Sequence, residues 1–398
     1  MRAFNPYTPG AGFMPTVLAG RDDLLEKTTI MLENLQRGYP QRSVVFFGLR
    51  GVGKTVLLNT IETAAENRDM LHDFIEATEN ALFKKRLIAA ISRLVHQLSL
   101  RENAAALAQR CADLLKSFRL SYGLEDQKLS LEMWDKPVQV TGIYEEDLTE
   151  VFLHLGKTAS KAACQICLFL DEMQYLSGED IAALISAMHR CNQLRLPVIL
   201  FCAGLPKIKR MVGEARSYSE RLFAFEEIGA LDESAAIDAI TGPAEREGIE
   251  FEEAAVAAII RVTERYPYFL QELCSVVWEQ TEQARITEAD VNAATDAFYK
   301  RLDQGFFSIR YERCSNGERD FMTAMVQCGA LPCTISKVAS ILGKTVRSVS
   351  PIRAKLINKG LIFATGHAEI DFTVPQFDGF LRRMNPELGF VGKEQSTK

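Results

Sequence analysis

The 398-residue sequence lacks any apolar run long enough to cross a membrane as a helix, which takes about 20 residues. Its first residues, MRAFNPYTPGAGF, also lack the charged-then-apolar order of a secretory leader. Both absences argue against a membrane partner and against export, so we expect a cytoplasmic protein. A composition with 47% hydrophobic and 25% charged residues is typical of a globular chain, and the length predicts two or three domains.

Paired metal ligands are missing as well. The nine cysteines are scattered through apolar surroundings, as buried reduced thiols are. Cys164 and Cys167 have the spacing of half a zinc or redox site, but no second pair of Cys or His follows at ligand spacing. We therefore interpret this pair as part of a packed strand.

What the sequence does contain is a phosphate-binding loop. Residues 48–55, GLRGVGKT, satisfy the pattern G-x-x-x-x-G-K-[ST] and follow an apolar run typical of a strand. Glycines in such a loop let backbone N–H groups converge on phosphate oxygens, while Lys54 reaches the β- and γ-phosphates and Thr55 ligates Mg²⁺. The loop therefore predicts ATP and Mg²⁺. The residues expected at the nucleotide are Gly48, Arg50, Gly51, Val52, Gly53, Lys54, Thr55 and Val56.

A second motif ends another apolar strand. Residues 165–170, QICLFL, are typical of a central parallel strand buried on both faces, and Asp171 and Glu172 follow directly. Because parallel strands present ligand sites at their carboxyl ends, we expect both carboxylates beside the phosphate loop. We predict that Asp171 joins the Mg²⁺ shell through water and that Glu172 orients and deprotonates the attacking water. The plainer alternative is a strand that merely ends in two acidic residues.

Further strands are predicted at 196–203 and 222–228, so strands alternate with helices as in a sheet covered on both sides. Between them lie Arg216 and Arg221, candidates for a charge that reaches the γ-phosphate of a neighbouring subunit. We prefer Arg221 for this role. A surface ion pair is the alternative for either arginine.

Three other stretches have clear patterns. Residues 81–118 show one long helical pattern, whereas 119–142 lose the helical period and predict a loop or small hairpin. Residues 232–305 predict helices broken at Gly242-Pro243 and at Tyr266-Pro267. This fits a small helical lid on the nucleotide that moves when the γ-phosphate leaves.

The net charge of −6 is unevenly distributed. Residues 311–398 hold 12 Lys and Arg against 8 Asp and Glu, a balance of +4, so residues 1–310 carry −10. The stretch 337–367 contains six basic residues and no acidic one. Such a local basic segment on an acidic chain is typical of a nucleic-acid contact.

The same tail has the pattern of a winged helix-turn-helix. Helices are predicted at 317–327, 334–342 and 346–358, followed by a two-stranded wing around Gly366. Pro351 is awkward in the third helix, so this helix either starts at Ser350 or bends there. A small domain of this kind that binds a protein partner is the alternative to one that binds double-stranded DNA. The residues predicted to contact DNA are Arg347 and Lys355 on the outward face of the third helix, with Lys344 and Lys359 at the phosphates.

Together these motifs resemble an AAA+-type ATPase of the group related to origin-recognition-complex ATPases, in a bacterial and archaeal branch that ends in a winged helix. The resemblance extends over nearly the whole chain, through AGRDDLLEK, GLRGVGKT, LFLDEMQYL, ILFCAGLP, SYSERLF, ERYPYFLQELC and FTVPQFDGFLRR. It implies that Gly20 and Arg21 lie near the base, that Arg221 is an arginine finger, and that Tyr266 and Pro267 border the nucleotide. The strand before Gly204 lacks the polar sensor residue of many such ATPases.

The sequence thus predicts an α/β P-loop core at 1–231, a helical lid at 232–310 and a winged helix at 311–398. We interpret the chain as an ATP-binding, ATP-hydrolysing switch protein that forms a nucleotide-dependent homo-oligomer and binds DNA. Hydrolysis is expected to be slow or stimulated by a partner. One alternative is a signalling or defence regulator like the STAND ATPases, whose tail binds a protein partner. Another is a target-selection ATPase of a mobile element, suggested by the phrase DEMQ.

Overall fold

The computed structural model describes residues 4–10, 12–78, 82–101, 103–124, 140–217 and 219–388. The chain divides into two compact units. Unit 1 comprises Met1–Gly20, Leu49–Val52 and Gly229–Lys398, and unit 2 comprises Arg21–Gly48 and Gly53–Ile228. The predicted domain boundaries near residues 231 and 310 stay predictions.

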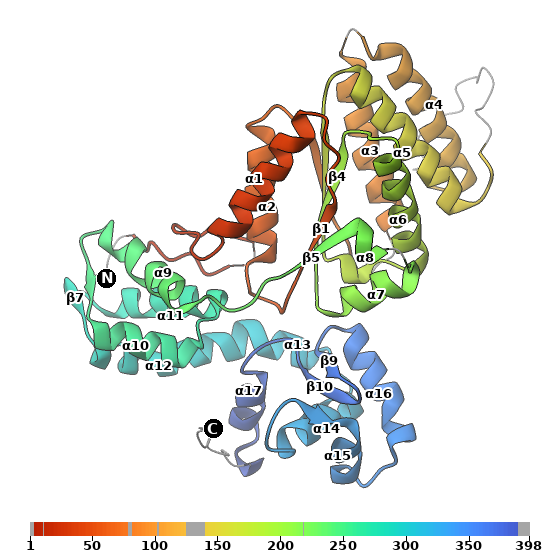
Figure 1. The fold of residues 1–398 in the computed structure, drawn as a ribbon. Helices are drawn as coiled ribbons and strands as arrows, with labels where there is room; N and C mark the ends of the chain where they lie inside the picture. The colour runs from red at the N-terminus through yellow and green to blue at the C-terminus, as the bar shows by residue number, and fades with distance from the viewer. Residues whose placement is uncertain are drawn as a thin grey trace. The chain divides into compact units, whose positions relative to one another are not determined.

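Unit 2 is built on five parallel strands in the order β2-β3-β4-β1-β5 (Figure 1). The strands are β1 (Ser43–Phe47), β2 (Leu71–Glu76), β3 (Ile166–Asp171), β4 (Val198–Gly204) and β5 (Phe223–Glu227). The helices are α1 (Asp22–Gln36), α2 (Lys54–Glu66), α3 (Phe83–Ser99), α4 (Ala105–Ser121), α5 (Tyr144–Lys161), α6 (Gly178–Gln193), α7 (Lys207–Ala215) and α8 (Ser219–Leu222).

The position of each strand in the sheet follows from its sequence. The inner strands β1, β3 and β4 are buried at every residue, because helices cover both faces of a parallel sheet. The edge strands β2 and β5 carry polar residues such as Asp73 and Glu227 and are only partly buried. Phe169 on β3 and Phe201 on β4 stack with ring centroids 5.5 Å apart, which ties the two central strands together.

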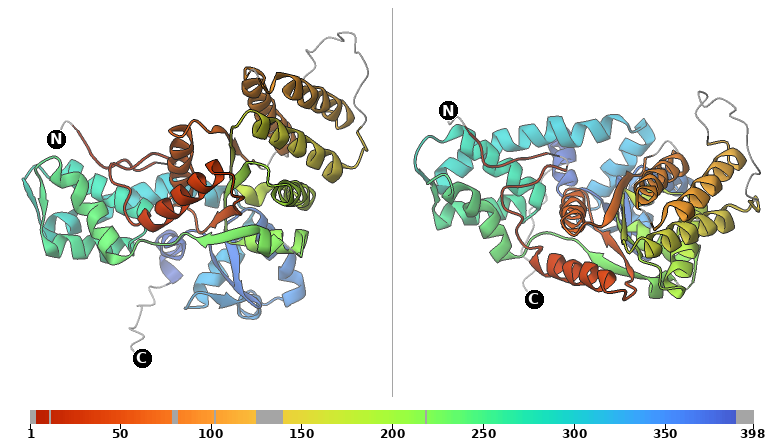
Figure 2. Two further views of the ribbon diagram at one scale, coloured as in Figure 1. Left: turned by 45° about the horizontal axis from the view of Figure 1, so that its top comes forward. Right: turned by 90° about the horizontal axis from the view of Figure 1, so that it is seen from above.

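Helices α1 and α2 cover one face of this sheet, and α3, α5 and α6 cover the other (Figure 1). Helix α4 packs on α3 and α5 (Figure 2). The long helical pattern predicted over 81–118 is confirmed as helical, and it is divided into two helices because the chain turns back between α3 and α4. A single helix of that length would be about 57 Å long, so its two halves could not both pack against α5 as α3 and α4 do. Residues 119–121 belong to α4, and residues 125–139 of the predicted loop or hairpin lie outside the described part of the chain.

The part of unit 1 between residues 229 and 312 is mainly helical, as predicted for the lid. Its elements are α9 (Glu233–Glu245), β6 (Glu250–Phe251), α10 (Glu253–Thr263), α11 (Pro267–Gln280), β7 (Arg285–Ile286), α12 (Glu288–Leu302), a π-helical turn (Asp303–Phe307) and α13 (Ser308–Glu312). The predicted break at Tyr266-Pro267 is confirmed, because α11 begins at the proline. The break predicted at Gly242-Pro243 is wrong: Pro243 lies in the last turn of α9, where its missing N–H removes only one hydrogen bond before the helix ends.

The tail contains the predicted three helices and two strands, in the predicted order. Its elements are α14 (Asn316–Gln327), β8 (Cys333–Thr334), α15 (Ile335–Ile341), α16 (Val346–Asn358), β9 (Ile362–Gly366), β10 (Glu369–Phe372) and α17 (Phe377–Met384). The short strand β8 was not predicted and pairs with β10, giving the order β8-β10-β9. Helix α16 begins at Val346 with Thr345 as its N-cap, so Pro351 lies inside the helix and the alternative start at Ser350 is wrong.

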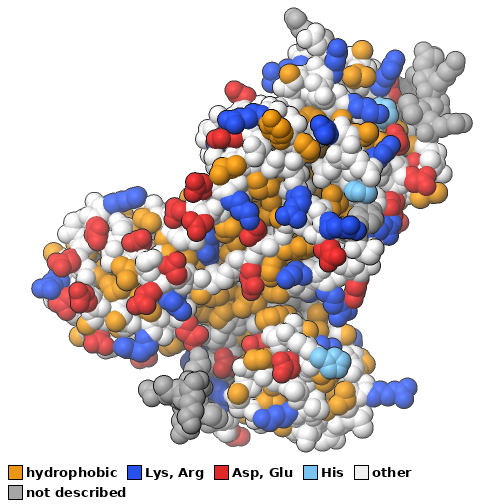
Figure 3. Space-filling model, viewed as in Figure 1, with side chains coloured by type: hydrophobic (Ala, Val, Ile, Leu, Met, Phe, Trp, Pro, Cys, Tyr) orange, Lys and Arg blue, Asp and Glu red, His pale blue; other side chains and the backbone are white. Residues whose placement is uncertain are grey.

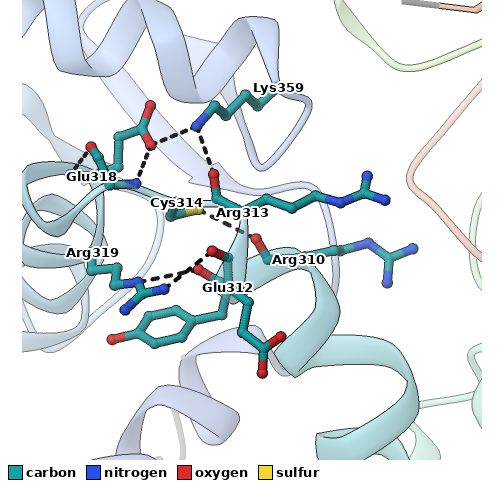
Figure 4. Close-up of polar contacts among 9 residues, drawn as sticks. Arg310, Glu312, Arg313, Cys314, Glu318, Arg319 and Lys359 are labelled. Atoms are coloured by element: carbon teal, nitrogen blue, oxygen red, sulfur yellow. Dashed lines mark hydrogen bonds and ion pairs between the residues drawn. The ribbon is translucent and has the colours of Figure 1, made fainter.

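Side chains of the tail cap the end of α13 (Figure 4). Arg319 on α14 donates to the carbonyl of Tyr311 at 3.3 Å, and Lys359 donates to the carbonyl of Arg313 at 3.0 Å. Because the last carbonyls of a helix have no partners within it, such basic groups stabilise its end. Lys359 also pairs with the buried carboxylate of Glu318 at 2.7 Å. The helix that leads out of the lid is therefore joined to the tail through a folded junction.

Within the described residues, none of the helices has both the length and the apolar character that spanning a bilayer requires.

Candidate functional site

The predicted phosphate loop, residues 48–55, connects β1 to α2. Gly51 and Gly53 have φ angles of 84° and 89°, in the left-handed region that residues with a Cβ rarely adopt. Gly53 is the N-cap of α2, which begins at Lys54. The first N–H groups of a helix have no partners within it, so the end of the loop supplies donors for an anion.

Within unit 1, the tip of the loop contacts the start of α11. The hydroxyl of Tyr266 donates to the carbonyl of Arg50, and the N–H of Tyr268 donates to the carbonyl of Gly51 at 3.2 Å. A Cβ on Gly51 would lie 3.1 Å from side-chain atoms of both tyrosines. Glycine is therefore needed at position 51 both for its φ angle and for this close approach. Pro267, predicted to border the nucleotide, lies between the two tyrosines as the first residue of α11.

The ammonium of Lys54 lies over the loop, 3.0 Å from the carbonyl oxygen of Gly48. Gly48 also donates its N–H to the carbonyl of Gly204, at the end of β4, at 3.2 Å. These contacts fix the base of the loop to the sheet and keep the positive charge of the lysine at the loop, where a phosphate is expected to bind.

Thr55 and Asp171 are 116 residues apart in sequence and meet in unit 2. The hydroxyl of Thr55 donates to the carboxylate of Asp171 at 2.6 Å. Asp171 ends β3 and is only 4% exposed. Burial raises the pKa of Asp171 above its ordinary value, the hydrogen bond from Thr55 opposes this rise, and the nearby charge of Glu172 adds to it. A cation at this position would favour the ionised carboxylate.

The chemistry of Thr55 and Asp171 fits Mg²⁺. This ion takes oxygen ligands, and in nucleotide sites it uses one or two protein groups together with substrate phosphates and water. Among the residues that the structure describes, no cluster of three or more Asp, Glu, His or Cys side chains could hold a metal by itself. The two side chains therefore suit a metal that arrives with a nucleotide.

Glu172 follows β3 in a left-handed conformation, with φ 55° and ψ 36°. This costs a residue other than glycine about 1–3 kcal/mol, and such conformations cluster at functional sites. Its N–H donates to Asp171 at 2.7 Å, and its carboxylate accepts a hydrogen bond from the side chain of Gln174. Sequence reasoning missed Gln174, although a polar residue in the otherwise apolar stretch 173–176 was a signal.

The two candidate arginines differ in their surroundings. Arg216 forms an ion pair with Glu145, which also accepts a hydrogen bond from Ser186 at 2.5 Å. Burial by itself would raise the pKa of Glu145, but the hydrogen bonds from Arg216 and Ser186 outweigh it and lower the pKa. Arg221 lies exposed on α8 instead. Arg216 is therefore held within unit 2 by Glu145, whereas Arg221 is accessible at the surface.

Four further nucleotide-site predictions remain. Gly20 has φ 65°, and a Cβ there would lie 2.6 Å from that of Ala235, so glycine is required for packing within unit 1. Arg21 is 9% exposed, and Val52 and Val56 are buried. Nothing in the structure tests whether these residues contact a nucleotide, and their roles stay predictions.

The basic residues of the tail fall into two groups. Lys344, Arg347 and Lys355 are exposed, and Figure 3 shows Lys and Arg side chains at the edge of the tail. The face of α16 opposite to Arg347 and Lys355 contains Val349 and is buried, as predicted. Lys359 already pairs with Glu318 in the junction to α13, so its charge is partly neutralised.

Comparison with protein families gives two matches. Residues 17–201 match the family described as AAA ATPase domain, a range that includes the phosphate loop, Asp171 and Glu172. Residues 304–381 match a family described as a domain of unknown function, DUF8462. Comparison with curated proteins gives no match.

Several solved structures have a similar fold. A Walker-type ATPase of Pyrococcus abyssi is 14% identical with a TM-score of 0.52, over 92% of this chain and 97% of that one. RuvB of Thermotoga maritima, a Holliday junction branch migration motor, is 16% identical with a TM-score of 0.46, over 90% and 95%. ORC1 of Aeropyrum pernix, solved in complex with DNA, is 16% identical with a TM-score of 0.44, over 94% of both chains. At 14% identity the likeness to the Pyrococcus abyssi ATPase concerns the fold alone. The family match and the parallel sheet confirm the resemblance to AAA+-type ATPases, which rests on the AAA ATPase domain matched by residues 17–201.

Proposed function

We propose that the protein binds ATP with Mg²⁺, hydrolyses it, and thereby controls how its tail binds double-stranded DNA. The observation that carries the nucleotide part is the 2.6 Å hydrogen bond between Thr55 and Asp171, beside the loop that holds Lys54. A hydroxyl, a carboxylate and an ammonium at one edge of a parallel sheet are what phosphoryl transfer in this class of ATPase requires.

In this proposal each residue has one task. The N–H groups of residues 51–55 and the ammonium of Lys54 hold the phosphates. Thr55 and Asp171 would hold Mg²⁺, and the ion when bound would offset negative charge on the phosphate oxygens. Glu172 orients the attacking water and takes its proton. The water oxygen bonds to the γ-phosphorus as the bond to the bridging oxygen breaks, which gives ADP and inorganic phosphate.

Arg221 is proposed to complete the site of a second copy of the chain. Its exposure on α8 supports this role over Arg216, which is engaged by Glu145. A guanidinium supplied from outside stabilises charge that develops on the γ-phosphate, and in related systems such a group is worth about 10³–10⁵ in rate. Turnover would then depend on assembly.

We expect ATP turnover per subunit to rise with protein concentration. Light scattering should also give a larger molecular mass for the protein in ATP than in ADP. Arg221→Ala should remove this rise and lower turnover at least about 100-fold, because the finger is lost while the cradle of each subunit stays intact. Arg210→Ala serves as the control, since Arg210 is also an exposed arginine, on α7, and pairs only locally with Glu214. Turnover independent of concentration and equal in Arg221→Ala would refute a finger supplied in trans.

For the tail, we propose a winged helix that binds duplex DNA through α16. Three exposed basic residues and the absence of acidic residues over 337–367 support this proposal. Binding of this kind releases counterions from the phosphates and is therefore steeply dependent on salt.

Binding to a short duplex, measured by fluorescence anisotropy at several salt concentrations, should weaken steeply with salt. Arg347→Ala and Lys355→Ala should each reduce the slope of log K against log salt by about 1, because each removes one phosphate contact. Lys161→Ala, an exposed lysine at the end of α5 in the other unit, should change nothing. No binding, or binding insensitive to salt, would contradict the DNA proposal.

The second candidate function is a nucleotide-gated regulator whose tail binds a protein. Ile341 and Val346, beside the turn between α15 and α16, are 38% and 42% exposed, and apolar side chains at such a position suit a protein contact. The salt titration separates the two candidates, because only the DNA proposal requires the steep slope.

A further inference from the structure

Gln174 lies just past the end of β3, in the short 3₁₀ turn Met173–Tyr175, and is only 3% exposed. Both ends of its amide are engaged. The Oε1 atom accepts a hydrogen bond from the N–H of Leu205 at 3.0 Å, and Nε2 donates to the carboxylate of Glu172. Only this orientation of the amide satisfies both partners, because an N–H can only donate and a carboxylate can only accept.

The contact with Leu205 lies where β4 ends. A Cβ on Gly204 would be 3.0 Å from Oε1 of Gln174, so the glycine leaves room for the glutamine side chain. The end of this strand carries no polar side chain of its own, since it consists of Ala203 and Gly204. Gln174 therefore places a polar group at the end of β4 from the neighbouring strand.

The same strand end is bound to the phosphate loop. The carbonyl of Gly204 accepts the N–H of Gly48 at 3.2 Å, and the carbonyl of Gly48 accepts the ammonium of Lys54 at 3.0 Å. A continuous path of hydrogen bonds and backbone thus runs from the loop through Gly204 and Leu205 to Gln174. All of it lies in unit 2.

We propose that Gln174 is a positioning residue for hydrolysis: it orients the carboxylate of Glu172 and links that orientation to the state of the phosphate loop through Leu205 and Gly204. This inference rests on the proposed function, in which Glu172 prepares the attacking water. The side chain of Glu172 is half-buried and has three rotatable bonds, so a buried amide donor narrows the range of positions that its carboxylate adopts. Misplacement of a catalytic group by about 1 Å costs about 100-fold in rate.

The test compares binding with turnover. Gln174→Ala should lower single-turnover hydrolysis of γ-labelled ATP by about 10–100-fold, while the dissociation constant for a fluorescent ATP analogue stays within about threefold. Gln174→Glu keeps an acceptor for the N–H of Leu205 and so guards against misfolding, yet it replaces the donor toward Glu172 by a second carboxylate and should also lose turnover. Gln193→Ala is the matched control, since Gln193 is an exposed glutamine at the end of α6.

A double variant distinguishes positioning from a merely structural role. If Gln174 acts through Glu172, Gln174→Ala should lower turnover no further in a Glu172→Gln background, because both changes remove the same contribution. An additional loss there, or a loss of nucleotide affinity in Gln174→Ala, would show a structural role and overturn the inference. Full turnover in Gln174→Ala alongside an inactive Glu172→Gln would overturn it as well and leave the proposed function intact. If wild-type protein hydrolyses no ATP, or hydrolyses it as fast as Glu172→Gln does, the proposed function itself is overturned, and this inference with it.

Discussion

Replacing Glu172 by glutamine should lower ATP turnover by about 10²–10⁴-fold and leave ATP affinity within about threefold. The substitution keeps the size of the side chain but removes its charge, so the attacking water loses the group that takes its proton. Binding should persist because the loop and Lys54 are held to the sheet through Gly48 and Gly204, and Glu172 takes part in neither of these hydrogen bonds. Steady-state release of phosphate and equilibrium binding of labelled ATP measure the two quantities.

Glu179→Gln is the matched control for this variant. Glu179 is a nearby exposed carboxylate on α6 that pairs with Lys84, so its loss should change turnover by less than about twofold. Equal turnover in wild-type protein and Glu172→Gln would remove Glu172 from its proposed role. A large fall in affinity would show that the change disturbs the strand end instead, where Glu172 already adopts a strained backbone conformation.

The sheet could be predicted from the sequence because its inner strands are apolar, whereas its edge strands also carry polar residues. β1, β3 and β4 are continuous apolar runs, and only burial on both faces of a parallel sheet accommodates them. The predictions that were wrong concern the limits of helices, which tertiary packing determines. Nothing local, such as a glycine or proline, marks the turn between α3 and α4, and Pro243 is tolerated because it lies in the last turn of α9.

The parts of the candidate site that could be predicted are those in which a sequence motif fixes the position of its residues at the end of a strand. Thr55 meets Asp171 because β1 and β3 run parallel in one sheet with only β4 between them, so their carboxyl ends lie at the same edge. As a polar residue in an apolar stretch Gln174 could have been noticed, but its partners could not be predicted, because its direction depends on the left-handed conformation of Glu172, which nothing in the sequence indicates. Likewise, the ion pair of Arg216 with Glu145 and the exposure of Arg221 distinguish the two arginines in the structure, and neither feature can be read from their neighbours in the sequence.

Replacing Lys54 by alanine should weaken ATP binding at least about 100-fold, which corresponds to about 2.7 kcal/mol. The ammonium of Lys54 is held at the carbonyl of Gly48, at the base of the loop, so it adds a full positive charge to the neutral backbone N–H groups that are proposed to hold the phosphates. At an ATP concentration 100 times the dissociation constant, wild-type protein should gain about 2.7 kcal/mol of stability, which raises the Tm of a domain of this size by roughly 5–10 °C if each kcal/mol is worth about 2–4 °C. Lys54→Ala should show less than about a quarter of this gain at the same ATP concentration.

Thermal unfolding with and without ATP and Mg²⁺ measures this directly. Without ligand, Lys54→Ala should unfold close to the wild-type temperature, because a hydrogen bond such as that to the carbonyl of Gly48 is worth only about 1 kcal/mol. Lys157→Ala, an exposed lysine on α5, should keep the full ligand-induced rise. Chelation of Mg²⁺ should reduce the rise in wild-type protein, since in the proposed site Thr55 and Asp171 would hold the ion only together with the phosphates. A Lys54→Ala protein that ATP stabilises as strongly as wild type would place the nucleotide elsewhere in the chain and would exclude the phosphate loop as its site.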